Sequence, residues 1–349
     1  MYFVHPQLKS LKPLFKKTSD AGLKQKLAKF FPNRYILFTD SGRSAFRVAV
    51  KELGLENSEM LVPAYLCDIF LPIFQRYGIK PIFLDIDLKT FNINISEIEE
   101  KITPQTKSIL ASHTYGTPNE MDKILEIAKK HNLKIIEDCA HAFGIKYQDK
   151  FLGNFGDCAI FSLPKFLPVV CGGMLILKNP MEAKLKKPKF KFFNLIRFLR
   201  LFPFLATFSE NFRSSYDDRK DNLDIARQAP KTSLKIFDWY LENFEEQISK
   251  RKELADYFHK KLKEIGFQSS GISYISALTP KSIDRDKLFY NLRKKNIFCS
   301  RIWHKPIYPD LPNAREAAER TINLPLQNWY TEKDIDYLVR KVQSSISED

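Results

Sequence analysis

The sequence predicts an α/β fold in which a mostly parallel sheet is covered by helices on both faces. Residues 35–180 alternate short, β-rich apolar runs with stretches of helical pattern, which is typical of layered α/β domains. Several of the runs are apolar throughout, and this favours strands buried on both faces. Of the 349 residues, 44% are hydrophobic, enough for a large core and about two domains.

The elements follow in order along the chain. The expected strands are residues 35–39, 59–64, 80–86, 108–113, 133–139, 157–163 and 172–178. Helical patterns between them include residues 44–53, 66–77 and 119–131. The pattern of residues 231–265 predicts one or two long helices, and residues 300–308 are expected to end in a strand-like conformation. Thr331 is expected to cap a closing helix with Asp334.

We therefore expect two domains. Residues 1–235 form a large domain with a basic aromatic insertion at about 184–215, and residues 236–349 form a long helix and a smaller α+β domain.

Composition excludes several classes of protein. The net charge of +15 and the pI near 9.4 favour anionic partners. No zinc finger, RRM signature or basic zipper accompanies that charge, so nucleic-acid binding is not expected. The five cysteines form no CxxC pair, so we expect reduced thiols, no metal site and a cytoplasmic protein. No signal peptide or membrane span is expected.

Ser41–Phe46, the run SGRSAF, follows a strand and opens a helix. Gly42 would let the backbone approach an anion, and the amides at a helix N-terminus attract phosphate. Taken alone, this is also the pattern of a common turn.

The run IIEDCAHAFG places Asp138 at the end of an apolar strand, where open α/β sheets bind ligands. An ionised carboxylate there could pair with a protonated ring nitrogen, and His141 could donate to a phenolic oxygen. An ordinary strand-end acid followed by a packed histidine is the simpler alternative.

The run GDCAIFSLPKFLPVVCGG places Lys165 among apolar residues just after a buried strand. Lysine is rare in such surroundings without a partner or a function, and an amine kept neutral there is a good nucleophile. Ser162 could bind phosphate. The alternative is a lysine that extends from a strand end into solvent.

The order and spacing of these three runs resemble the DegT/StrS family of sugar aminotransferases, which are fold-type-I pyridoxal 5'-phosphate (PLP) enzymes. PIFLDIDLKTFNI, KSILASHTYGTP and TINLPLQ extend the resemblance from Ile36 to Val342. It implies a seven-stranded sheet, PLP as cofactor and a homodimer whose sites are completed by the partner subunit.

The resemblance also implies roles for single residues. Lys165 matches the lysine that holds PLP covalently, and Asp138 matches the acid that faces the pyridine nitrogen. His141 would contact the cofactor hydroxyl and Ser162 the phosphate. The remaining cofactor cradle matches Gly42, Arg43 and Ser44.

Other positions bear on the ring and the substrate. Cys67 stands where the family has an aromatic residue that stacks on the ring, and Tyr65 is a candidate substitute. Tyr115, Trp303 and His304 match the substrate side, although packing explains Trp303 and His304 equally well.

The implied reaction moves an amino group from an amino acid, L-glutamate by resemblance, to a keto-sugar. A nucleotide-linked sugar for surface glycans or deoxyaminosugars is the expected acceptor. The dehydratase branch of the family carries histidine in place of Lys165 and is disfavoured. The alternatives are a non-catalytic regulatory or scaffold dimer, and a membrane-associated PLP enzyme acting on a lipid-linked substrate.

Residues 184–208 are basic and aromatic and contain no acid. They fit either a packed insertion at a dimer contact or an amphipathic helix lying on an anionic membrane surface. Pro203 would break a single long helix there.

Overall fold

The computed structural model describes residues 2–3, 6–8, 10–181, 183–188, 198, 201–202 and 225–346. Most of the basic aromatic segment 184–208, and the rest of the insertion expected up to 215, lies outside the described residues.

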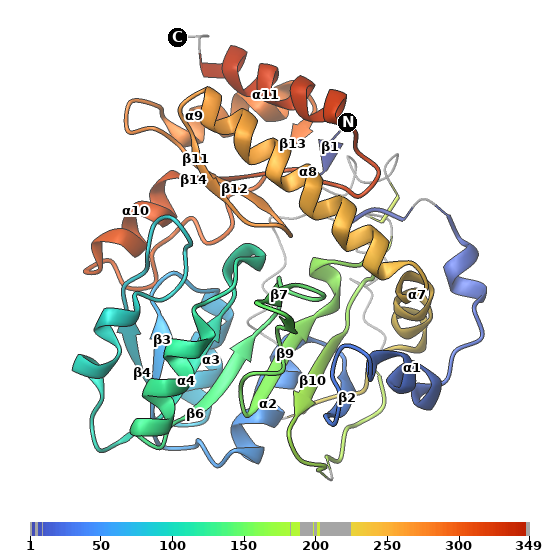
Figure 1. The fold of residues 1–349 in the computed structure, drawn as a ribbon, viewed down its shortest axis with the longest axis vertical. Coiled ribbons are helices and arrows are strands. Elements are labelled where there is room, and N and C mark those ends of the chain that lie inside the picture. The colour runs from blue at the N-terminus through green and yellow to red at the C-terminus, as the bar shows by residue number, and fades with distance from the viewer. Residues whose placement is uncertain are drawn as a thin grey trace.

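A seven-stranded sheet forms the centre of the molecule (Figure 1). All its strands are parallel except β10, which runs antiparallel to both of its neighbours. The strands, in spatial order, are β2 (Tyr35–Thr39), β10 (Gly173–Leu177), β9 (Cys158–Ser162), β6 (Lys134–Asp138), β5 (Thr106–Ser112), β3 (Glu59–Pro63) and β4 (Lys80–Leu84). Each lies on an expected strand to within two residues, so the predicted fold class is confirmed.

Helices bury both faces of this sheet. One face packs under α1 (Asp20–Leu27), α4 (Met121–Lys130) and α7 (Lys231–Leu241), and the other under α2 (Gly42–Glu52) and α3 (Leu71–Arg76). Ile135 and Ile136, adjacent in β6, enter these two different cores because successive side chains of a strand point to opposite faces. This explains why the strands are continuously apolar.

The C-terminal part has its own core against a three-stranded antiparallel sheet. Its elements are α8 (Phe244–Glu264), β11 (Gln268–Ser270), β12 (Ile275–Leu278), α9 (Arg285–Lys294), β13 (Ile297–Phe298), α10 (Pro312–Arg320), β14 (Thr321–Leu324) and α11 (Glu332–Ile346). Thr331 and Asp334 exchange backbone-to-side-chain hydrogen bonds before α11, as expected of a capping pair. The domain boundary near residue 235 stays a prediction.

Residues 231–265 form two helices, α7 and α8, in agreement with the expected one or two. One sequence expectation in this region needs adjustment. Residues 300–308 form no strand beyond a single bridge between Ser300 and Asn323, because they make a loop that approaches the central sheet. None of the described helices is both long and apolar enough to cross a membrane.

The short elements tie the chain ends and loops together. β1 (Tyr2–Phe3) pairs in parallel with β13, and the Gln327 side-chain amide donates to the Phe3 carbonyl at 2.7 Å. The remaining short elements are the hairpin β7 (Lys146–Tyr147) and β8 (Lys150–Phe151) and the 3-10 turns η1 (Lys12–Phe15), η2 (Asp68–Phe70), η3 (Ile95–Glu97), η4 (Glu99–Lys101), η5 (Thr114–Gly116) and η6 (Leu163–Lys165).

A buried carboxylate joins the two parts of the fold. Asp85 follows β4 and accepts hydrogen bonds from the backbone N–H groups of Asn313 and Ala314 at 3.0 and 2.8 Å. These groups lie in the first turn of α10, whose own N-cap residue Leu311 provides no side-chain acceptor. Asp85 therefore caps α10 across the boundary between the large part, which holds the seven-stranded sheet, and the small C-terminal part, from α8 to α11.

Candidate active site

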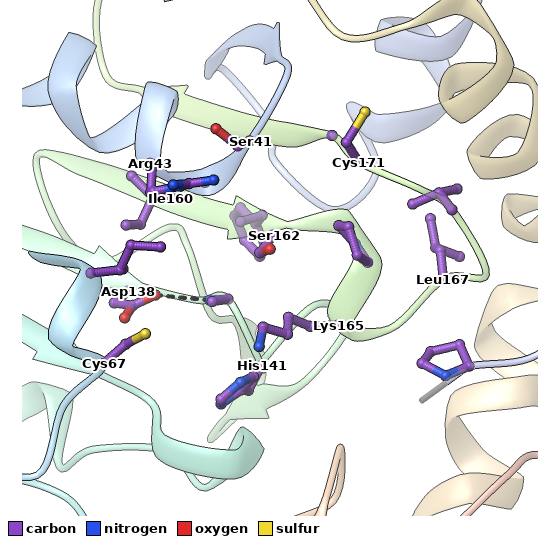
Figure 2. A pocket seen from close by; sticks show the side chains of 18 of the residues that line it. Ser41, Arg43, Cys67, Asp138, His141, Ile160, Ser162, Lys165, Leu167 and Cys171 are labelled. Carbon is purple, nitrogen blue, oxygen red and sulfur yellow. Dashed lines mark hydrogen bonds between the residues drawn. The ribbon is translucent and has the colours of Figure 1, made fainter. Parts of the chain in front are cut away.

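A cavity of about 450 Å³ opens at the edge where the parallel strands end. Parallel strands bring their carboxyl ends to one edge of the sheet, so residues distant in sequence meet there. The expected site residues that line it are Arg43, Cys67, Asp138, His141, Ser162 and Lys165, which Figure 2 labels, together with Gly42 and Trp303.

Asp138 ends β6 and is 8% exposed. Its Oδ1 accepts the N–H of Ala140 at 3.0 Å and its Oδ2 the hydroxyl of Ser112 at 3.2 Å, which fixes the carboxylate plane. Burial raises the pKa of Asp138 above its usual value, and these hydrogen bonds oppose the shift. A cationic N–H group from a ligand would favour the ionised carboxylate further.

His141 lies three residues beyond and is also buried. Burial holds its pKa well below the usual value, and the positive charge of Lys165 adds to the effect, so the imidazole is neutral. The Tyr115 N–H donates to Nδ1 at 3.3 Å. The ring proton is therefore assigned to Nε2, which can donate to an oxygen in the cavity.

The N-terminus of α2 forms another wall, through Ser41, Gly42 and Arg43. Ser41 is the N-cap residue, and its Oγ accepts the Ser44 N–H at 3.2 Å. The close approach in this wall is at Gly173 of β10, where a Cβ atom would lie 2.3 Å from the Ser41 carbonyl carbon. A glycine at position 173 is thus required for packing against the helix N-terminus.

Lys165 ends η6, directly after β9, and its side chain and that of His141 point toward one another (Figure 2). Its charge acts on Asp138 and His141, and it opposes the rise that burial causes in the pKa of Cys67. Ser162, where β9 ends, faces the same cavity. The amine, acid and imidazole therefore share one enclosed space.

Three expected site residues do not line the cavity. Ser44 is buried, and its hydroxyl donates to Asp40 at 2.5 Å. Tyr115 is fully buried with its hydroxyl 2.6 Å from that of Tyr65, and it reaches the site only through the backbone N–H that orients His141. His304 is exposed on the loop after β13.

Several lining residues were not nominated from the sequence. Ser41 could have been found as the N-cap of the helix that SGRSAF opens, and Ser112 as the neighbour of Asp138 on β5. Gln7 and Leu201 also line the cavity, and the Leu8 N–H donates to the Leu201 carbonyl at 2.6 Å. Leu201 therefore packs at the site, although it belongs to the segment 184–208.

A second polar cluster lies beneath the cavity. His113, Glu137 and Cys139 bring potential metal ligands within 4.8 Å of one another. The Glu137 carboxylate accepts N–H groups of Gly153, Phe155 and Gly156 at 2.7–2.8 Å and lies 3.3 Å from His113 Nε2. These bonds satisfy the carboxylate, so the cluster anchors the loop before β9.

The site suits a planar aldehyde phosphate. It offers an amine nucleophile, a buried carboxylate, a neutral imidazole donor and the N–H groups at the start of α2. With a mostly parallel seven-stranded sheet, this arrangement defines a fold-type-I PLP enzyme.

The chain belongs to the DegT/DnrJ/EryC1/StrS aminotransferase family, whose model matches residues 17–343. It is accordingly a PLP-dependent sugar aminotransferase. It is 28% identical to the GDP-perosamine synthase of Escherichia coli O157:H7 over 90% of this chain and 86% of that protein. It is 29% identical to the dTDP-4-amino-4,6-dideoxy-D-glucose transaminase of Shigella dysenteriae over 92% and 88%.

Solved structures agree on the fold. Helicobacter pylori PseC, an aminotransferase of pseudoaminic acid biosynthesis, superposes with a TM-score of 0.76 at 17% identity, covering 100% of both chains.

Proposed function

We propose that this enzyme transfers the amino group of L-glutamate to a nucleotide-linked keto-sugar, in the synthesis of deoxyaminosugars for surface glycans. The observation that carries the proposal is the convergence of Lys165, Asp138 and His141 on one cavity beside the N-terminus of α2. The relatives named for GDP- and dTDP-linked sugars support a nucleotide-linked acceptor. A net charge of +15 would attract such an anion.

Bound PLP supplies a ring that withdraws electrons from the carbon bearing the substrate amine. Ser41, Gly42 and Ser162 would hold its phosphate, through the helix N-terminus and a serine hydroxyl. Asp138 would accept the N–H of the ring nitrogen, and its own hydrogen bonds keep the carboxylate aligned for this.

His141 Nε2 would donate to the ring hydroxyl, because the Tyr115 backbone occupies Nδ1. Lys165 Nζ would form the covalent bond to the cofactor. When the substrate amine has displaced Lys165, the freed Nζ of Lys165 would carry a proton to and from the reacting carbon. Leu167 and Val169, buried in the cavity wall, would exclude water from that step.

Absorption spectroscopy tests the proposal. The purified protein loaded with PLP should show a visible band that L-glutamate discharges, and a keto-sugar nucleotide should restore it. Lys165→Ala should lack that band, whereas Lys107→Ala, a change of an exposed lysine on β5, should behave as wild type. A wild-type protein that binds no PLP would support a regulatory or scaffold role instead.

We also propose that the enzyme works as a homodimer, since the resemblance implies a site completed by the partner subunit. Light scattering after size exclusion should give twice the 40.8 kDa chain mass. A single-chain mass for an active enzyme would contradict this.

A further inference from the structure

Trp303 brings an aromatic ring from the small part of the molecule into the cavity of the large part. It lies on the loop between β13 and α10 and lines the same cavity as Lys165. Its ring is nearly parallel to that of His141, with centroids 5.7 Å apart and 27° between the planes. Trp303 thus places a ring of the small part beside His141.

The backbone around this ring is held in an unfavourable conformation. Phe91, Tyr115 and Trp303 have φ values of 60°, 57° and 56°, in the left-handed region that bulky residues rarely adopt. Their rings contact one another, with centroids 5.5 Å apart for Phe91 and Tyr115 and 5.6 Å for Tyr115 and Trp303. Such conformations persist only where packing enforces them, and they gather at ligand sites.

The neighbouring side chain at position 67 is small. Cys67 and Trp303 line the same cavity, and the indole slightly opposes the rise that burial causes in the pKa of Cys67, so the two side chains lie close together. A large aromatic ring at position 67 would compete with the indole for this space. Because position 67 carries a thiol, the indole can cover the wall above it.

Other aromatic rings near the cavity are engaged elsewhere. Tyr65 is 2% exposed, lies behind the lining and meets Trp303 edge-on at 5.2 Å. Phe70 packs against Phe46 in the core under α2, and Phe298 stacks on Phe3 at 4.9 Å. His141 is committed to its hydrogen bond with the Tyr115 backbone.

We propose that Trp303, seated over Cys67, is the aromatic wall against which the planar PLP ring packs. The inference rests on the proposed binding of PLP at Lys165. The acid and the amine come from the central sheet, and the flat apolar surface comes from a loop of the small part. Trp303 would therefore contact the cofactor directly, and a bound ring would touch both parts of the molecule.

Titration of the cofactor-free protein tests this assignment. Trp303→Gly removes the ring and also relieves the positive φ, so any loss cannot come from new backbone strain. We expect it to weaken PLP binding, followed by the visible band, about tenfold, with Trp303→Phe losing less. Inorganic phosphate, measured as a competitor, should bind all variants equally because it has no ring. Trp239→Phe, a change on α7 outside the cavity, is the matched control.

A second variant moves the aromatic ring. Cys67→Phe combined with Trp303→Gly should recover PLP affinity, because a ring at either position can cover the same wall. The assignment is overturned if Trp303→Gly binds PLP as wild type does, or if phosphate and PLP affinity fall together. It is equally overturned if the folded double variant recovers nothing. A wild-type protein without the visible band would instead refute the proposed function.

Discussion

Removing the Asp85 carboxylate should loosen the joint between the two parts of the fold. The change Asp85→Ala deletes the acceptor for three backbone N–H groups, those of Ile86, Asn313 and Ala314, at 2.8–3.0 Å. Two of them begin α10, which has no local side-chain cap. Losing a helix cap costs about 1 kcal/mol, and a hydrogen bond to a charged group about 1.5–3 kcal/mol. Since water can solvate part of the exposed helix end, we expect a net loss of about 3 kcal/mol.

Urea unfolding followed by far-ultraviolet circular dichroism, at one fixed protein concentration, measures this loss. Asp87→Ala is the matched control, because within the described part of the chain that exposed carboxylate accepts only a local bond from the Lys89 N–H at 2.6 Å. We expect it to change the unfolding free energy by less than about 0.5 kcal/mol. Equal effects of the two changes, or an unchanged unfolding free energy for Asp85→Ala, would refute the capping role.

Three further predictions concern the site and the segment beside it. Gly173→Ala should abolish PLP binding, seen as loss of the visible band, because its Cβ would lie 2.3 Å from the Ser41 carbonyl carbon; a variant that retains the band would contradict this. Burial raises the pKa of Asp138 in the folded, cofactor-free protein above its ordinary value of 3.8. The folded protein therefore binds the carboxyl proton more tightly than the unfolded chain does. Stability consequently falls as the pH rises from about 3.8 through the folded-state pKa. Asp138→Asn should flatten this decline in melting temperature against pH while lowering amino transfer roughly a hundredfold or more; an unchanged pH profile would refute the assignment. Replacing residues 184–208 with a neutral linker should abolish sedimentation with anionic liposomes if the segment lies on membranes, and unchanged pelleting ends that idea.

The sheet could be predicted from the sequence because its strands are buried on both faces. Such strands carry continuous apolar runs, and all seven were expected close to their observed positions. The placement of Asp138, His141 and Lys165 near strand ends was predicted from the same apolar runs, and parallel topology brings such ends to one edge. Their expected roles came from the resemblance to the family and not from this placement.

Contacts between distant segments could not be predicted in this way. The family resemblance placed Trp303 on the substrate side, with packing as an equal alternative, and Trp303 does line the cavity because its loop crosses from the small part. Ser44 was expected in the cradle, but as the third residue of α2 it turns toward Asp40 and Arg47. Tyr115 acts through its backbone N–H, which no side-chain pattern reveals.

The inverted strand β10 has a consequence for how the site assembles during folding. Every other pairing within the seven-stranded sheet joins strands separated by a crossover or by a long stretch of chain, but β9 and β10 form a hairpin whose connection carries Lys165. Pairings local in sequence need little loop closure and form early. The lysine that we propose binds the cofactor therefore lies in the part of the sheet that can assemble first, before the acid at the end of β6 arrives beside it.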